Sequence, residues 1–242
     1  MKKIFFLTIL LASFNLHSQS KSGKAIYSVK IQSDSLLKKT MSFRLREKYE
    51  RAENEIKNLK LKLIFNDTIS WFSEEKNTNV DPFALKIADC EKTFFTDLLS
   101  NQVLFTVSER KGIFSKNEFL VQKTIENNWI FTNEVKFIQN FKCYKAYQEI
   151  SIKNDEGTFY RTIIAWYCPE IPFTFGPKGY CDLPGLILEL HDKNTVFGLT
   201  ELSIYNNSLN IDLPKKGEKL DYDKYLEILK ERVMKRMELS EN

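Results

Sequence analysis

The chain has 242 residues, of which 43% are hydrophobic and 28% are charged. This composition is typical of an ordinary globular domain, with enough apolar side chains to form a substantial core. The formal net charge of +4 is close to neutral for this length. Electrostatics therefore give no reason to expect a nucleic-acid partner.

The first 20 residues have the three-part layout of a secretory signal peptide. Lys2 and Lys3 form a positive end, residues 4–14 form a short apolar segment, and small or polar residues follow at 18–20. The apolar segment is shorter than the roughly 20 residues of a membrane-spanning helix, which disfavours a membrane anchor. We therefore expect residues 1–18 to be a signal peptide. The mature chain should be exported, periplasmic or secreted, without a transmembrane segment.

Four cysteines follow the predicted signal peptide, and export affects how they are interpreted. An even number of cysteines in an oxidising compartment indicates disulfide bonds, and four cysteines allow three pairings. Cys168 and Cys181 bracket a loop with three prolines and two glycines, and its closure would stabilise the fold by about 3 kcal/mol. We favour Cys168–Cys181, which leaves Cys90–Cys143. The alternative of a metal site is disfavoured, because the spacings fit no zinc pattern.

The segment after the signal peptide predicts a strand followed by a helix. Apolar residues alternate along residues 24–31, which indicates a strand. In residues 38–59, apolar positions recur at alternating steps of four and three, at Leu45, Tyr49, Ala52, Ile56 and Leu59. This pattern predicts an amphipathic helix, which we expect to pack on its own sheet rather than in a coiled coil.

The rest of the chain alternates between β-rich segments and turn residues, which predicts a mainly antiparallel sheet. The predicted strands are residues 59–65, 68–75, 103–109, 117–124, 143–153, 158–168, 185–192 and 195–205. A C-terminal helix is predicted to pack through Tyr222, Tyr225, Leu226, Leu229, Val233 and Met237. With no linker or repeat, residues 24–239 should form one α+β domain. Its mainly antiparallel sheet should be curved or sandwich-like, with a helix after the first strand and another at the C-terminus.

The segment CDLPGLILELHD, residues 181–192, joins a proline–glycine pair to an apolar run. Pro184 at the second turn position and Gly185 at the third predict a type II turn. Residues 186–188 then predict a strand that is buried on both faces or central in the sheet. The local physical chemistry therefore indicates a rigid turn that leads into a buried strand.

The residues around this turn resemble the GLPGLI family of exported proteins from Bacteroidetes-type bacteria. The segment AWYCPEIPFTFGPKGYCDLPGLILEL, residues 165–190, resembles the family's PEIP segment, GP pair and name motif, although Asp182 replaces the first glycine of the name. The segments NFKCYKAY and LPKKGEKLDYDKY resemble other parts of the family pattern. Cys168 stands where the family suggests a threonine-like residue, which supports the Cys168–Cys181 pair. The biochemical function of the family is unknown, so the resemblance implies no particular activity.

Our first functional hypothesis is a non-enzymatic binding or accessory protein for an envelope protein, a peptide or an apolar ligand. Aromatic side chains on a concave sheet would suit such a ligand, although most aromatic residues on strands form core. The predicted binding surface comprises Pro169, Glu170, Pro172, Gly176, Pro177, Gly179, Leu183, Pro184, Gly185, Leu186 and Ile187. The aromatic candidates are Trp71, Phe72, Trp129, Phe131, Trp166, Tyr167, Phe173 and Phe175. We expect no cofactor.

An envelope hydrolase is the alternative, with His191 acting beside Glu170 or Glu189. His191 is the only histidine after the predicted signal peptide. The chain has neither a G-x-S-x-G nucleophile elbow nor a glycine-rich phosphate loop, and we assign no catalytic residue. A third possibility is that the motif only organises the core. Substitution of Lys178, expected to be an exposed loop residue, would then leave partner binding unchanged.

Overall fold

The computed structural model describes residues 21–32, 35–75, 80–107, 113–115, 118–154 and 157–241, and the predicted signal peptide lies outside them. Its strands are β1 (Ser22–Ile31), β2 (Lys60–Phe65), β3 (Ile69–Glu74), β4 (Phe94–Asp97), β5 (Gln102–Thr106), β6 (Phe119–Thr124), β7 (Ile130–Ile138), β8 (Phe141–Asn154), β9 (Gly157–Cys168), β10 (Leu186–Asp192), β11 (Thr195–Tyr205) and β12 (Glu218–Asp221). Its helices are α1 (Ser35–Thr40), α2 (Phe43–Ile56), α3 (Pro82–Ile87) and α4 (Tyr222–Glu241), with a short 3₁₀ turn, η1 (Pro177–Gly179).

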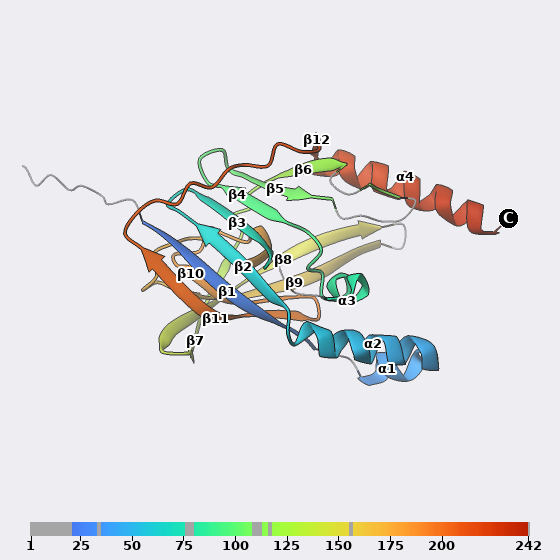
Figure 1. Ribbon diagram of the computed structural model, residues 1–242, viewed down its shortest axis with the longest axis horizontal. Helices are drawn as coiled ribbons and strands as arrows, with labels where there is room; N and C mark the ends of the chain where they lie inside the picture. The colour runs from blue at the N-terminus through green and yellow to red at the C-terminus, as the bar shows by residue number, and fades with distance from the viewer. Residues whose placement is uncertain are drawn as a thin grey trace, which may run out of the picture.

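The strands form one open sheet in the order β12-β6-β5-β4-β3-β2-β1-β11-β10-β9-β8-β7 (Figure 1). Every neighbouring pair is antiparallel except β12 with β6. This confirms the prediction of a mainly antiparallel α+β fold. The sheet is continuous and is not a two-layer sandwich. It is curved, because side chains of β4–β6 and of β8–β9 line opposite walls of one cavity.

Three strands and one helix were not predicted from the sequence. β12 consists of the polar residues EKLD, and β7 has exposed side chains throughout most of its length, so neither shows the alternation of a half-buried strand. β4 has four residues, too few for periodicity to show. α3 does have a sequence signal, because Asp81 caps it by accepting a hydrogen bond from the Phe83 amide and Pro82 occupies its first turn.

The predicted amphipathic helix is present as α2, which contacts β1 and α3. Tyr49, Ala52 and Ile56 are buried, as the spacing predicts. Leu45 is 44% exposed, because it lies in the first turn of α2. The predicted start at residue 38 was early, since the separate helix α1 includes that position.

The C-terminal helix α4 contacts the sheet mainly through residues 222–232. Tyr225 is buried in a small cluster with Phe105, Phe114 and Phe119, and Arg232 forms an ion pair with Glu118 at 2.8 Å. Further along the helix, Met237 is 62% exposed, and Leu226 nearer its start is 41% exposed. The predicted packing face of this helix therefore included two residues, Leu226 and Met237, whose side chains are exposed. Among the described residues, no helix is sufficiently long and apolar to span a membrane.

The loop between β9 and β10 carries the sequence motif and is folded onto the sheet. The Ile187 amide donates to the Phe175 carbonyl at 2.9 Å, and the Leu186 amide donates to the Ile171 carbonyl at 3.0 Å. The Phe173 ring lies 4.6 Å from that of Phe65, between their centroids. η1, at the far end of the loop, contacts β3 and β4. The loop thus connects β9 and β10 with strands at the other side of the sheet.

The predicted type II turn at Pro184–Gly185 is wrong in its details. The Gly185 amide donates to the Leu183 carbonyl at 2.7 Å, which closes a tighter γ-turn around Pro184. Gly185 has a positive φ of 146°, and a Cβ atom there would lie 2.1 Å from the Cys168 carbonyl oxygen. The glycine is therefore required by its contact with the end of β9 as well as by its backbone conformation.

Asp182, which precedes the Leu-Pro-Gly segment, has a left-handed backbone with φ of 69°. Glycine adopts this conformation without steric cost, whereas residues with a Cβ atom are strained by about 1–2 kcal/mol. A glycine would therefore fit this position, and aspartate is accommodated there because it tolerates left-handed φ better than most residues.

We predict that Asp182→Gly stabilises the fold by up to about 1 kcal/mol, because relief of strain exceeds the entropy cost of glycine. Asp182→Ala retains the strain and should be about 1 kcal/mol less stable than the glycine variant. Thermal unfolding of the three proteins measures both differences. An alanine variant as stable as the glycine variant would show that position 182 is not strained.

Candidate functional site

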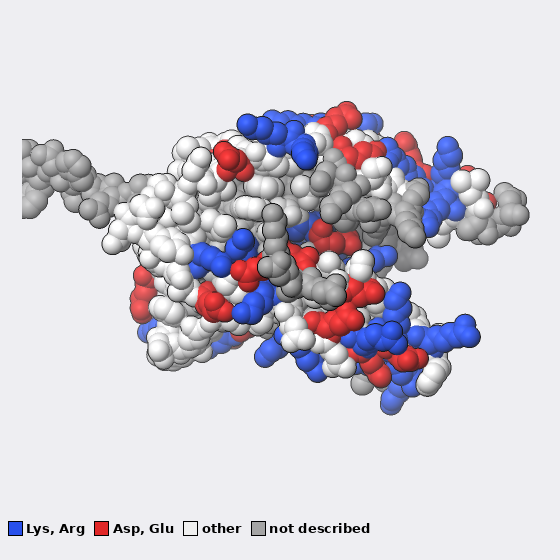
Figure 2. All heavy atoms as spheres, in the orientation of Figure 1, with Lys and Arg blue, Asp and Glu red and all other residues white. Residues whose placement is uncertain are grey.

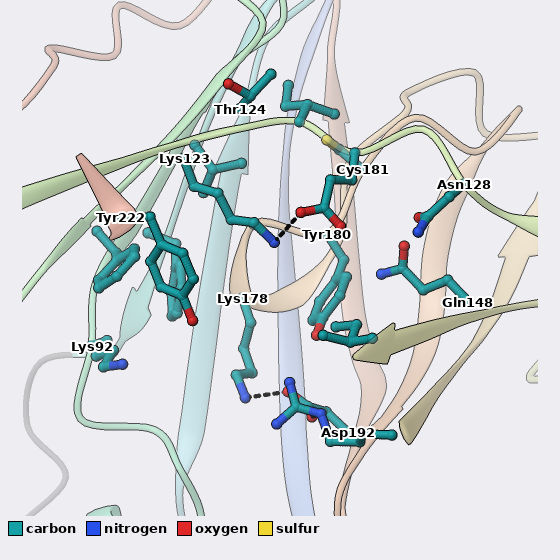
Figure 3. A pocket seen from close by; sticks show the side chains of 18 of the residues that line it. Lys92, Lys123, Thr124, Asn128, Gln148, Lys178, Tyr180, Cys181, Asp192 and Tyr222 are labelled. Atoms are coloured by element: carbon teal, nitrogen blue, oxygen red, sulfur yellow. Dashed lines mark hydrogen bonds and ion pairs between the residues drawn. The ribbon is translucent and has the colours of Figure 1, made fainter. Parts of the chain in front are cut away.

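A cavity of about 960 Å³ lies between the two walls of the curved sheet. Phe105 from β5 lines one wall, and Gln148 from β8 lines the other. Tyr180 from the motif loop and Tyr222 from the start of α4 also line the cavity (Figure 3). Seven parts of the chain thus meet here: the segment after α3, β4–β6, the β6–β7 connection, β8–β9, the motif loop, the end of β10 and α4.

Lys178 of the motif loop is a buried charge at this cavity. Its Nζ lies 2.7 Å from Oδ2 of Asp89 and 2.5 Å from Oδ2 of Asp192, and its side chain is 7% exposed. Figure 3 shows the Lys178 side chain extended toward Asp192. The prediction that Lys178 is an exposed loop residue was therefore wrong. The physical reason is the turn, in which Lys178 has a φ of 58° between the buried Pro177 and Gly179.

Two buried polar atoms beside this ion pair lack a hydrogen bond. Oδ1 of Asp192 and Nε of Arg161 are 3.5 Å apart, which is close enough for charge attraction, yet neither atom makes a hydrogen bond within the protein. Asp192 is 2% exposed. Both atoms are inaccessible to water, so the charge attraction between them compensates for the missing hydrogen bonds.

The ion pairs shift the pKa values of the groups involved. Burial raises the pKa of Asp89, but the charge and hydrogen bond of Lys178, together with Lys193 and Lys92, outweigh burial and lower it to about 2. Burial lowers the pKa of Lys178, but Asp192 and Asp89 outweigh that effect and raise it. Lys92 has a lowered pKa because burial dominates. The Lys178 ammonium and the Asp89 carboxylate are therefore both charged at neutral pH.

Aromatic and amide groups form much of the cavity lining. The Trp129 indole donates to the Cys181 carbonyl at 2.9 Å, and its ring meets that of Tyr180 edge-to-face, with 6.2 Å between centroids. Figure 3 shows the amide groups of Asn128 and Gln148 directed into the cavity. The lining therefore offers flat apolar surfaces beside hydrogen-bonding groups.

Charges of both signs line the cavity in nearly equal number. The basic side chains are Lys92, Lys123, Arg161, Lys178, Lys193 and Lys230, and the acidic ones are Asp89, Glu126, Glu149, Asp192 and Asp223. One of these pairs, Lys123 with Glu126 at 2.9 Å, lies apart from the Lys178 ion pairs. Figure 2 likewise shows basic and acidic side chains interspersed on one face of the molecule, most densely over α2. Neither the cavity nor that face is dominated by one sign of charge.

Most of the predicted binding surface is buried. The buried members are Gly176, Pro177, Gly179, Leu183, Gly185, Leu186 and Ile187, whereas Pro169, Glu170, Pro172 and Pro184 are exposed. Of all these residues only Gly179 lines the cavity. A Cβ atom on Gly176 would lie 2.6 Å from the Ile187 side chain, and one on Gly179 would lie 2.6 Å from Val103. These glycines allow the loop to pack closely on the sheet.

The aromatic candidates belong mainly to the core. Phe72, Trp129, Tyr167, Phe173 and Phe175 are buried, Trp71 and Trp166 are partly buried, and Phe131 is 56% exposed. Trp129 is the one that lines the cavity. The charged residues of the site were not predicted from the sequence, although a signal for one of them was present. Arg161 shares a strand face with the buried Ile163 and Ala165, where a charged residue is unexpected without a partner.

All four cysteines are buried free thiols, so neither predicted disulfide is present in the structure. Cys181 lines the cavity, and its backbone forms a bridge with Phe175. Cys90 follows α3 and donates to the Ala88 carbonyl. Within the described part of the chain, no group of His, Cys, Asp and Glu side chains is arranged to hold a metal ion.

The groups proposed for a hydrolase are only partly brought together. His191 Nε2 lies 2.5 Å from Oε1 of Glu189, and Lys136 Nζ lies 2.6 Å from the same oxygen. These residues do not line the cavity, because His191 precedes Asp192 by one residue on β10 and therefore faces the other side of the sheet. Glu170 is exposed just after β9.

A family model described as "Protein of unknown function (Porph_ging)" matches residues 153–189. The matched segment includes the end of β8, all of β9, the motif loop and the start of β10. It relates this stretch to a Bacteroidetes-type family of unknown function, while the GLPGLI name itself stays a prediction. No curated protein matches the chain.

Two solved structures of PNGF-II, in the P21 and C2 space groups, resemble this fold with TM-scores of 0.52 and 0.50. Their sequences are 13% and 14% identical to this chain, and the alignments cover 88% of it. The chain spans about a third of the PNGF-II chains, with 34% and 33% of their lengths covered. Identity at this level shows a shared fold alone.

We predict that Asp89 makes the fold sensitive to acid. Its folded pKa of about 2 lies below the ordinary value of 3.8, so its stabilising contribution is fully present above about pH 4 and is lost as the pH falls to about 2. The contribution is up to about 2 kcal/mol. Urea unfolding at a series of pH values measures it. Asp89→Asn should lose less stability over this range than the parent, whereas Asp212→Asn, an exposed control with the same charge change, should follow the parent. Parallel curves for all three proteins would contradict the assignment.

Proposed function

We propose that the protein is an exported, non-enzymatic binding module of the bacterial cell envelope, whose cavity holds a neutral polar ligand. The observation that supports this proposal is the mixed lining of the cavity, in which the amides of Asn128 and Gln148 lie beside the rings of Trp129, Tyr180 and Tyr222. A side-chain amide both donates and accepts hydrogen bonds. A hydroxyl or amide group of a ligand can therefore pair with either amide.

The charge balance of the lining favours a neutral ligand. Basic and acidic side chains occur in nearly equal number around the cavity, and the most buried of them are already paired at Lys178. A strongly charged ligand would leave some of these pairs uncompensated, which is costly at buried positions. The same charges disfavour a purely apolar ligand. Such a ligand would displace the water that hydrogen-bonds to the charged side chains and would offer no hydrogen bonds in return.

The size and walls of the cavity suggest a ligand of several rings or residues. Its volume of about 960 Å³ lies near the upper end of the roughly 300–1,000 Å³ of small-molecule pockets. The rings of Trp129, Tyr180 and Tyr222 offer flat surfaces next to the amides of Asn128 and Gln148. A hydroxyl- or amide-rich ligand such as an oligosaccharide or an uncharged peptide fits this mixture.

Placement in the envelope is part of the proposal and has separate support. The first 20 residues have the layout of a signal peptide, and the motif segment matches a Bacteroidetes-type family of unknown function. Expression in a bacterial host, followed by sequencing of the mature N-terminus in the periplasmic fraction, tests export independently of ligand binding.

We predict that Gln148→Leu weakens ligand binding by roughly three- to tenfold, because it removes one hydrogen-bonding amide at nearly constant volume. Isothermal titration calorimetry with a panel of neutral oligosaccharides and a panel of uncharged capped peptides measures the effect. Gln122→Leu is the matched control, because the Gln122 amide donates to Asp221 outside the cavity. Binding by neither panel, or equal binding by both variants, would contradict a site in this cavity.

A hydrolase is the second candidate, favoured by the contact between His191 and Glu189. Lys136 shares the same carboxylate oxygen, and together with His191 it lowers the pKa of Glu189 against the effect of burial. His191→Ala discriminates between the candidates in the same experiments. Unchanged ligand binding without any hydrolysis by the parent supports the binding module, whereas hydrolysis that the variant loses would establish the enzyme.

A further inference from the structure

Cys143 and Cys168 lie at the ends of the paired segments of two neighbouring strands, β8 and β9, one residue beyond the last recorded pair of their ladder. The antiparallel register of β8 and β9 pairs Asn154 with Gly157 and continues without interruption to Tyr144 and Tyr167. The next residues along this register are Cys143 and Cys168. Residues directly opposite on antiparallel strands project their side chains to the same face, with Cα atoms about 4.5–5.5 Å apart.

The surroundings of the two thiols bring them into contact. Both residues are completely buried, with 0% exposure. The Cys143 thiol is within hydrogen-bonding reach of the Cys168 sulfur, which also accepts hydrogen bonds from the backbone of Glu170 and Ile171. These backbone contacts hold the Cys168 sulfur at the end of β9. The Cα separation typical of opposite residues lies within the range of about 4.4–6.8 Å found in disulfides.

We propose that Cys143 and Cys168 form a cross-strand disulfide in the exported protein, and that Cys90 and Cys181 stay reduced. This pairing differs from both pairs predicted from the sequence. Cys181 is instead held beside Phe175 by a backbone bridge, with its carbonyl bonded to Trp129. The proposal is independent of the ligand that the cavity binds.

The oxidant required is an external disulfide, carried by a small molecule or by an oxidoreductase. The thiolate of one cysteine attacks a sulfur of that disulfide, which forms a mixed disulfide and releases one thiolate of the oxidant. The second cysteine thiolate then attacks the mixed disulfide, forms the Cys143–Cys168 bond and releases the other thiolate. The two cysteine protons end on the two released thiols. The cysteines lose two electrons, and the oxidant gains them.

The reaction belongs to the folding stage. Burial raises the pKa of Cys143 to about 12, so the thiol in the native fold is a poor nucleophile. β8 and β9 are consecutive in the chain and form a hairpin, so the two cysteines meet as soon as this local register forms. Once β10 and the motif loop have covered them, the bond should resist soluble reductants.

Disulfide mapping of the wild-type chain tests the proposal. The chain is exported to a bacterial periplasm, its free thiols are alkylated under denaturing conditions, and its peptides are analysed by mass spectrometry. We expect one linked peptide pair containing Cys143 and Cys168, with Cys90 and Cys181 alkylated. The same chain denatured with a reductant should show four alkylated cysteines. A bond from Cys168 to Cys181, any bond to Cys90, or four alkylated cysteines in the periplasmic protein would overturn the proposal.

Single substitutions provide a second measurement. Cys143→Ser and Cys168→Ser should each abolish the intramolecular bond, and Cys90→Ser should retain it. In the parent, reduction should lower the midpoint of thermal unfolding on the order of 10 °C, given the loop of about 25 residues that the bond closes. Reduction should leave the midpoints of Cys143→Ser and Cys168→Ser unchanged. Equal sensitivity of the parent and these variants to reductant would contradict the assignment.

Discussion

The ion pairs of Lys178 are the constraint on which the arrangement of the motif depends. One ammonium group joins Asp192 at the end of β10 to Asp89 after α3, which are far apart in the sequence. Lys178 is 7% exposed and Asp192 is 2% exposed. Removal of one partner from such a pair typically costs 3–5 kcal/mol, because the remaining charge stays buried. This lysine therefore stabilises the motif loop in the interior of the curved sheet.

Several unusual backbone conformations also allow the motif loop to lie in this position. The left-handed conformation of Lys178 and the absence of a side chain at Gly179 allow η1 to lie close to Val103 on β5. At the other end of the loop, Gly185 approaches the Cys168 carbonyl more closely than any Cβ atom permits. The glycine and proline pattern of the motif is therefore a requirement of close packing. The cavity lies beside this packed loop, and the loop residues Lys178, Gly179, Tyr180 and Cys181 form part of its lining.

Elements with a clear apolar period could be predicted, and those without one could not. The face of α2 formed by Tyr49, Ala52 and Ile56 and most central strands followed from periodicity, whereas the exposed strand β7 and the polar strand β12 did not. The site was harder to predict because its charges come from separate segments. Lys178 looks like a loop lysine in the sequence, and Asp192 looks like a turn residue. Their burial depends on the long-range curvature of the sheet, which a local pattern does not encode.

A double-mutant cycle at Lys178 and Asp192 tests the central role of this ion pair most directly. The free energy of unfolding is measured for Lys178→Met, Asp192→Leu and the combined variant, with the exposed Lys60→Met as control. We expect Lys178→Met to lose about 3–5 kcal/mol and the combined variant to be clearly more stable than the sum of the single losses implies. Lys60→Met should lose less than about 1 kcal/mol. A small loss for Lys178→Met, or strictly additive losses, would contradict a buried ion pair that holds the motif in place.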